Sequence, residues 1–264
     1  MKPIASARYL TVEASKVPWR SVTLDDGEIV QLQLYADGAE GNPEAVRFRF
    51  SEGYKTEPHF HLSSQFQLVL SGSIKFPHER LDAPAIHYTD HHVAYGPFIA
   101  SNGHEMMVLR SKPSGIVLMK DKVARRQANP LGRELSRSAH EVESEFLPGY
   151  KDARRKILIP ETAGPAAEIV ECPPGMEFTA AAVPTYGRYE IIIKGAVTVD
   201  GKSLGPNSLR FVQADEHPVP LECGPEGATV IVLTYDQDAE QSYGGSILKD
   251  MADLENWLVS GNAY

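Results

Sequence analysis

The feature that most constrains this chain is an order of strands and turns that occurs twice. In the segment from Gly53 to Met119, a glycine opens a strand, and the apolar run 66–70 then leads into a Ser-Gly-Ser turn and a further strand. The segment from Gly175 to Tyr235 has the same order, with the apolar run 189–193 followed by Lys-Gly-Ala. A repeat on this scale predicts two copies of one structural unit.

Each copy has the composition of a small β-barrel. The chain has 19 prolines and 21 glycines, placed between short runs of Val, Ile, Leu and Phe, which favours short strands and tight turns. Each copy also closes on apolar strands, such as 106–109 and 229–233, and a closed barrel removes exposed sheet edges. We therefore expect an all-β chain of two tandem jelly-roll β-barrel domains.

The segments outside the repeats set the expected boundaries. Residues 122–156 are charged and interrupted by prolines and glycines, which predicts a connector, with some helix around 138–146, between domains spanning 1–121 and 157–264. Apolar residues in 247–258 have a nearly helical spacing. They predict a short C-terminal helix that covers one barrel or forms a dimer contact, and we expect a homodimer.

Composition excludes several other classes of protein. The net charge of −9 argues against nucleic acid as a partner, because phosphate binding needs a concentrated basic face. The N-terminus has no apolar signal-peptide core, and no run approaches the about 20 apolar residues of a membrane span. These features predict a cytoplasmic protein without a membrane partner. Cys172 and Cys223 are expected to be buried or partly buried thiols, because two cysteines far from the histidines indicate neither a disulfide framework nor a thiolate zinc site.

A pair of histidines carries the strongest chemical signal. His59 and His61 are separated by one residue, and side chains alternate along a strand, so both imidazoles are expected on one face. Iron, nickel, copper and zinc accept imidazole nitrogen at about 2.0–2.2 Å. The pair therefore predicts a mononuclear metal site in the first domain.

Here the sequence resembles the cupin superfamily. Its first motif, Gly-x5-His-x-His-x3-Glu-x6-Gly, is matched at every spacing from Gly53 to Gly72, but Gln65 stands where the family has glutamate. The second motif supplies a third histidine, a role that His104 fits, although Gly96-Pro97 lies further upstream than the family's proline-x-glycine. The resemblance implies a bicupin that holds one divalent metal through His59, His61, His104 and Gln65.

Strand alternation also indicates what else lines the pocket. Gln65, Gln67 and Val69 share the parity of the histidine pair, so Gln65 and Gln67 are candidate catalytic residues that would contact substrate or oxygen. By the same logic, Met106 and Val108 should join His104. The expected pocket has a polar floor and apolar walls, as small-molecule sites commonly do.

Two other pairs of polar residues have weaker patterns than the His59 and His61 pair. His91 and His92 are adjacent and lie in a turn-rich loop, so they are expected not to share a metal. Arg47 and Arg49 alternate with apolar residues and would recognise a carboxylate if they faced the pocket. They are more simply solvent-facing.

The second domain should lack the metal. Aligning its glycines with those of the first places Ala181 and Val183 at the two histidine positions, and neither can coordinate. His217 and Glu190 remain near the other ligand positions. This domain is expected to be a scaffold, a dimerisation surface or a metal-free pocket.

Neutral ligands leave the charge of a divalent metal uncancelled, so the site should favour a small, anionic, chelating substrate. By resemblance to cupin dioxygenases, the leading hypothesis is an iron-dependent dioxygenase acting on a small organic acid or a diketone-like compound. A Lewis-acid isomerase or lyase with Zn, Mn or Ni is the second. A third is a metal-sensing or ligand-sensing module, because the stretch from Trp19 through the histidine pair also resembles the cupin module of ChrR-type anti-sigma factors.

Overall fold

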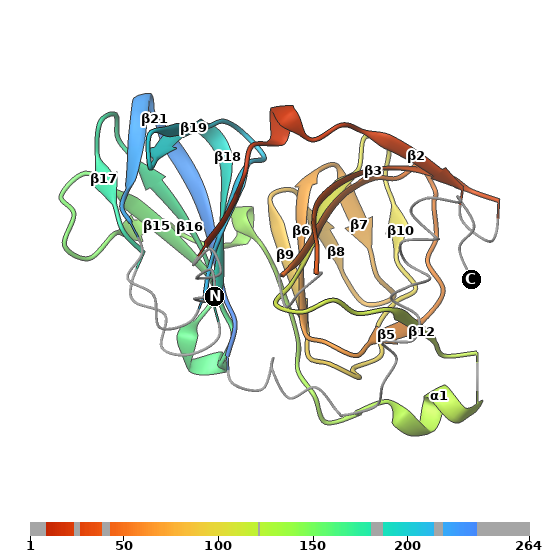
Figure 1. Ribbon diagram of the computed structural model, residues 1–264. Coiled ribbons are helices and arrows are strands. Elements are labelled where there is room, and N and C mark those ends of the chain that lie inside the picture. The colour runs from red at the N-terminus through yellow and green to blue at the C-terminus, as the bar shows by residue number, and fades with distance from the viewer. Residues whose placement is uncertain are drawn as a thin grey trace, which may run out of the picture. The chain divides into compact units, whose positions relative to one another are not determined.

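The computed structural model describes residues 9–23, 27–38, 43–120, 122–180, 187–213 and 219–236. These residues form β-sheets grouped into two compact units (Figure 1). We call the described part of 18–138 the first module, and the described parts of 9–17 and 139–236 the second module. The expected C-terminal helix and the positions of Ala181, Val183 and His217 lie outside the described residues.

The first module is built on one large antiparallel sheet. Its strands follow the order β13-β9-β6-β11-β4-β3-β2. Their bounds are β2 (Arg20–Thr23), β3 (Ile29–Asp37), β4 (Glu44–Arg49), β6 (Gln65–Ser71), β9 (Ala85–Thr89), β11 (Glu105–Arg110) and β13 (Glu134–Ser138).

Shorter strands complete this module. They form the sheets β10-β7-β8 and β12-β5. Their bounds are β5 (His59–His61), β7 (Ser73–Lys75), β8 (Arg80–Asp82), β10 (Ile99–Ala100) and β12 (Ile116–Leu118), and the helix α1 (Lys122–Gln127) follows.

The apolar interior of the first module follows from strand alternation. Val69 on β6 pairs with Met106 on β11, and Met106 pairs with Phe48 on β4, so these side chains share one face. They pack with Ile74 and Phe98 in one buried cluster. Gln65 and Gln67 lie on the same face of β6, toward its other end.

The second module repeats the arrangement in a larger sheet. Its strands follow the order β1-β20-β18-β21-β16-β15-β14, with β17 paired to β21 and β19 to β18. Their bounds are β1 (Tyr9–Val12), β14 (Glu145–Phe146), β15 (Arg154–Ile159), β16 (Ala166–Cys172), β17 (Glu177–Phe178), β18 (Arg188–Val199), β19 (Lys202–Leu204), β20 (Leu209–Val212) and β21 (Leu221–Thr234). Short 3₁₀ turns occur at Ala14–Lys16, Ala139–Glu141 and Glu161–Ala163.

Register shows that the two sheets are copies of one pattern. Gln67 on β6 pairs with His87 on β9, and Glu190 on β18 pairs with Arg210 on β20. Gln67 and Glu190 each precede a glycine, Gly72 or Gly195, by five residues. The internal repeat in the sequence therefore corresponds to a structural repeat.

The observed boundaries differ from the expected ones in two places. β1 pairs with β20, so the N-terminal strand belongs to the second module rather than to a domain spanning 1–121 (Figure 1). β13 pairs with β9, so part of the expected connector 122–156 completes the first module. Each of these strands extends an open sheet edge, which sequence periodicity alone does not reveal.

The connector also differs locally from the expected helix around 138–146. The structure has a 3₁₀ turn at Ala139–Glu141 and the strand β14 there, and places its helix earlier, in α1. The cysteines agree with expectation: Cys172 and Cys223 are both free and buried, within the apolar cluster of the second module. Among the described residues, no helix has the length and apolarity needed to cross a membrane.

Candidate metal centre

The histidine pair lies on β5 and points into the barrel of the first module. His59 and His61 are 3% and 5% exposed, and their ring centroids are 5.1 Å apart with nearly perpendicular planes. β12 holds this short strand, with Leu118 opposite His59 and Ile116 opposite His61. The pair therefore shares one face, as the sequence spacing predicts.

Backbone carbonyls fix the tautomer of each ring. His59 Nδ1 lies 2.6 Å from the carbonyl oxygen of Glu57, and His61 Nδ1 lies 2.9 Å from that of Gly115. A carbonyl can only accept, so each Nδ1 carries the proton and each Nε2 carries a lone pair. This is the orientation in which outer partners hold metal-binding histidines.

Both imidazoles are neutral at physiological pH. Burial lowers the pKa of His59 to about 4. Burial, together with the charge of Arg110, holds the pKa of His61 well below its usual range. Neutral rings are the form that binds metal.

Tyr95 is the residue that the sequence reasoning did not identify. Its backbone pairs with that of His59 in an isolated bridge, and its side chain is 4% exposed. Tyr95 Oη lies 2.9 Å from His59 Nε2, 2.6 Å from Gln65 Nε2 and 3.3 Å from Gln67 Nε2. Because both amides donate to this oxygen, its own proton points to His59. Burial raises the pKa of the Tyr95 phenol, and Arg110 and the two amides oppose this effect.

Gln65 and Gln67 reach the pocket, as strand alternation indicates, but each side-chain amide is hydrogen-bonded through both its nitrogen and its oxygen. Gln65 Oε1 accepts from Arg110 Nε at 3.0 Å and from Nη2 at 2.8 Å. Gln67 Oε1 lies 2.7 Å from His87 Nδ1. The oxygen of Gln65 is therefore engaged by Arg110 rather than offered to a metal, which removes Gln65 from the expected ligand set.

Arg110 is the second residue that the sequence reasoning did not identify. It ends β11, opposite Gln65 on β6 and Glu44 on β4, and it is 6% exposed. Its Nη2 lies 3.2 Å from His61 Nδ1 and 3.3 Å from His61 Nε2, and its Nη1 forms an ion pair with Glu44. A fixed guanidinium thus lies beside the histidine pair.

His104 is not brought to the histidine pair. It precedes β11, whose first residue, Glu105, pairs with Ser71 at the far end of β6 from Gln65. Gln65 and Ser71 are six residue steps of about 3.3 Å apart along β6. His104 instead stacks on Phe50, with ring centroids 5.8 Å apart. Because β6 and β11 run antiparallel, the residue of β11 that reaches the pair is Arg110, and His104 leaves the expected ligand set.

The other sequence candidates lie away from the pair or on another face. Arg47 and Arg49 both form ion pairs with Glu105, and the guanidinium of Arg49 lies 3.8 Å from the ring centroid of Trp19. They share the sheet face opposite the histidine pocket. His92 stacks on Phe60, and the backbone of His91 is held by Ser64.

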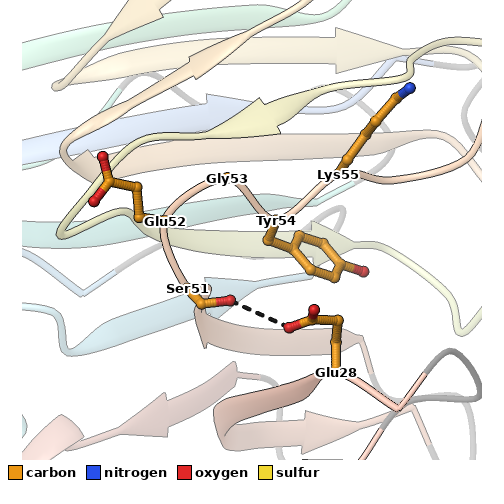
Figure 2. Close-up of a pocket in the computed structure, with 6 residues that line it drawn as sticks. All are labelled: Glu28, Ser51, Glu52, Gly53, Tyr54 and Lys55. Atoms are coloured by element: carbon orange, nitrogen blue, oxygen red, sulfur yellow. Dashed lines mark hydrogen bonds between the residues drawn. The ribbon is translucent and has the colours of Figure 1, made fainter.

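A hollow on the surface of the first module lies at the turn that opens the first motif. Figure 2 shows Ser51 donating to Glu28 there, beside Tyr54 and Lys55. The hollow contains no histidine, so it is separate from the buried pocket. Within the described residues, no three His, Cys, Asp or Glu side chains are placed to share a metal ion.

In the second module, a buried ionic cluster lies at the strand positions that correspond to Gln67 and His87 of the first module. Glu190 is fully buried between Arg188 and Arg210, which are each 1% exposed. Arg188 Nε donates to Glu190 Oε1 at 2.9 Å, and Arg210 Nε donates to Glu190 Oε2 at 2.6 Å. Glu190, near an expected ligand position, is therefore engaged by two guanidinium groups.

Comparison with known proteins places this architecture. No family model matches the sequence, and no curated protein matches it. Among solved structures, a proposed dioxygenase from Nostoc punctiforme has a TM-score of 0.65 at 13% identity, covering 89% of this chain and 85% of its own. Oxalate decarboxylase from Lactobacillus farciminis has a TM-score of 0.62 at 10% identity, covering 88% and 87%.

A variant of oxalate decarboxylase from Bacillus subtilis has a TM-score of 0.61 at 13% identity, covering 88% of this chain and 78% of its own. Identities this low concern the fold alone. The similarity extends over both modules, and these neighbours are cupin-fold proteins. The chain is therefore an all-β protein with the cupin fold.

Proposed function

We propose that the first module is the catalytic part of a metal-dependent cupin enzyme that acts on a small organic acid. The observation that carries this proposal is the buried histidine pair, whose Nδ1 atoms are tied to backbone carbonyls, which leaves the lone pairs on the Nε2 atoms that face Tyr95 and Arg110. His59 and His61 would hold the metal. A bound divalent ion would supply Lewis acidity or, as iron, one-electron chemistry with O₂.

Arg110 supports an anionic substrate. The metal and the guanidinium together would bring three positive charges to the pocket. Glu44 supplies one carboxylate, which is hydrogen-bonded to Arg110. Buried charge without compensation costs several kcal/mol. A carboxylate substrate would supply the missing negative charge and accept paired hydrogen bonds from the guanidinium.

The reaction that we propose first is an oxygenation with iron. The fold neighbours include a proposed dioxygenase, and the neutral protein ligands would leave coordination positions for substrate and O₂. Manganese is the alternative metal, because another fold neighbour, the Bacillus subtilis oxalate decarboxylase, has Mn(II) centres. With manganese, the same site would act on an organic acid without the oxygenase chemistry.

Metal analysis tests this proposal directly. The full chain, expressed with added iron or manganese, should retain close to one metal ion per chain, and His59→Ala and His61→Ala should each abolish retention. His91→Ala is the matched control, because that loop histidine lies outside the pocket, and it should leave retention unchanged. Equal metal loss in all three variants, or no metal in the unaltered chain, would overturn the proposal.

Turnover then separates the two metals. Oxygen uptake and carbon dioxide release should be followed with a panel of mono- and dicarboxylic acids. Oxygen consumption with the iron form supports the oxygenase. Carbon dioxide release without net oxygen consumption by the manganese form would support a lyase instead.

A further inference from the structure

A buried histidine outside the pair, His87, lies between two hydrogen-bond acceptors. It belongs to β9, opposite Gln67 on β6 and Ser136 on β13, and it is fully buried. Its Nδ1 lies 2.7 Å from Gln67 Oε1, and its Nε2 lies 3.0 Å from Glu134 Oε1. A neutral imidazole has one N–H group, so it could donate to only one of these two oxygens.

The orientation of the Gln67 amide follows from its other hydrogen bond. Gln67 Nε2 lies 3.3 Å from Tyr95 Oη, and an amide turned the other way would present its oxygen to that hydroxyl. Tyr95 would then face two acceptors, Gln67 Oε1 and the neutral His59, with a single proton. A hydroxyl cannot gain a second proton, whereas an imidazole can. The amide therefore keeps its oxygen toward His87, and His87 donates from both nitrogens.

The surroundings of His87 stabilise a positive charge on its ring. Glu134 is a carboxylate whose side chain is 42% exposed, so the ion pair stays in contact with water and its desolvation cost is reduced. The ring of Phe76 stacks on the imidazole, with centroids 4.5 Å apart and planes at 29°, and an aromatic face attracts a cation. An imidazolium at this position has both a counter-ion and satisfied hydrogen bonds, as a buried charge requires.

The hydrogen bond from His87 sets which end of the Gln67 amide reaches the pocket. Its length of 2.7 Å is in the range of bonds from charged donors, which are roughly twice as strong as neutral ones. The amide oxygen is held at His87, and the amide nitrogen points to Tyr95 in the pocket. Gln67 therefore presents N–H donors there, which the carboxylate oxygens of a bound acid would accept.

We propose that His87 is a positioning residue of the pocket, held as an imidazolium by Glu134, and that its Nδ1–H group orients the Gln67 amide with its nitrogen toward the substrate. The role toward a substrate rests on the proposed function, because it assumes that an organic acid binds beside Gln67. The charge of His87 and the orientation of the amide do not depend on that assumption or on a metal. They can therefore be tested separately.

Nitrogen NMR of the full chain with isotope-labelled histidines tests the charge. At about pH 8 an ordinary histidine is mostly neutral, with one protonated and one bare ring nitrogen, and these two differ widely in chemical shift. We expect His87 to keep two protonated nitrogens at this pH. Its signals are assigned by their loss in His87→Asn and by the proximity of the ring to Phe76. A bare nitrogen on His87 in the unaltered chain would overturn the proposal.

Removal of the counter-ion tests the role of Glu134. Glu134→Gln changes the charge with little change in size, and it should leave His87 with one bare nitrogen at about pH 8, because the attraction of the carboxylate is lost. Glu79→Gln is the matched control, since Glu79 accepts a hydrogen bond from Ser136, the residue paired with His87. It should leave His87 charged. A charge that persists in Glu134→Gln would show that Glu134 does not hold the proton.

The side-chain amide of Gln67 provides the readout for positioning. Its N–H protons should show nuclear Overhauser contacts to the Tyr95 ring in the unaltered chain. His87→Asn supplies a side-chain N–H group near the place of Nδ1 and should keep these contacts, whereas His87→Leu supplies no donor and should lose them.

These contacts also separate the positioning role from the proposed function. If the Gln67 N–H protons of the unaltered chain lie against His87 instead of Tyr95, or if His87→Leu keeps the contacts to Tyr95, His87 does not orient the amide, and the proposed metal function is unaffected. If the unaltered chain retains no metal but shows the expected charge and contacts, the proposed function fails and the positioning by His87 stands.

Discussion

Arg110 and His61 lie side by side, with Nη2 of the arginine 3.3 Å from Nε2 of the histidine. A guanidinium cannot give up its proton in a protein, so its positive charge is a permanent feature of the pocket. It repels a metal ion at His61 and attracts an anion to the same place. Metal binding and acid binding are therefore expected to support each other.

The first prediction concerns that coupling. In Arg110→Met, Mn(II) should bind at least about tenfold more tightly when no organic acid is present, because a like charge has been removed. The enhancement of metal affinity by added oxalate should shrink or disappear. Isothermal titration calorimetry with Mn(II), with and without oxalate, measures both effects.

The control for this variant also removes the negative charge of Glu44, the ion-pair partner of Arg110. Arg110→Met removes the guanidinium that forms an ion pair with Glu44, which keeps its hydrogen bond from the Ser114 amide. Removing one partner of a buried ion pair costs about 3–5 kcal/mol. The double variant Arg110→Met/Glu44→Gln removes both charges and should recover much of the stability. If the double variant binds Mn(II) no more tightly than the unaltered chain, the guanidinium does not oppose the metal.

Much of the site could be predicted from alternation along single strands. His59 and His61 are two residues apart on one strand, so their side chains share a face. The same spacing places Gln65 and Gln67 on one face of β6. Continuing the same alternation from Met106 through Val108 reaches Arg110, so this residue had a signal in the sequence. The cupin pattern instead points to His104, because its second motif supplies a histidine.

The rest depends on which strands pair, which a single sequence does not state. His104 lies at the wrong end of the barrel because β11 runs antiparallel to β6. Tyr95 reaches His59 through an isolated bridge formed outside the named strands, so periodicity gives no sign of it. In the same way, β1 joins β20 across most of the chain, and only the folded sheet reveals that the N-terminal strand belongs to the second module.

The second prediction is a loss of stability in acid through His104. Burial lowers its pKa to about 4, and the Ser71 carbonyl and the charge of Glu105 offset only part of this effect. Because this folded pKa lies below the ordinary histidine pKa of about 6.5, the unfolded chain binds more protons between these pH values. The stability contributed by neutral His104 is therefore present above about pH 6.5 and is lost as the pH falls to about 4.

Urea unfolding from pH 7 to pH 4 measures this loss. His104→Phe keeps a ring against Phe50 but cannot titrate, so its free energy of unfolding should fall by about 3 kcal/mol less than that of the unaltered chain. Replacement of the exposed His78 by Gln is the control for losing a histidine. A His104→Phe variant with the same pH dependence as the unaltered chain would contradict the prediction.

The third prediction concerns the ionic cluster of the second module. Glu190→Gln leaves Arg188 and Arg210 buried without their shared carboxylate, so the free energy of unfolding should fall by about 3–5 kcal/mol. Glu145→Gln breaks a largely exposed ion pair with Arg155 and should cost less than about 1 kcal/mol. Chemical denaturation of both variants gives the comparison, and equal losses would show that burial does not decide the cost.

The fourth prediction concerns Gly195, the glycine that corresponds to Gly72 of the first motif. It separates the backbone strain of a positive φ from the steric clash of an added Cβ. Gly195 has a φ of 72°, and an added Cβ would lie 2.1 Å from the carbonyl oxygen of Gly227. Gly201 has nearly the same φ, 71°, but an added Cβ there would meet no heavy atom within 4 Å. Both alanine variants carry the backbone strain of a positive φ, about 1–2 kcal/mol.

Only Gly195→Ala adds a clash with the neighbouring main chain, which must shift. Such overpacking costs about 1–3 kcal/mol more, so Gly195→Ala should lower the free energy of unfolding by clearly more than Gly201→Ala does. Thermal or urea unfolding of the two variants tests this difference. If both lose the same stability, the glycine is required for its φ alone, and the close approach of β18 to β21 at this position does not constrain the residue.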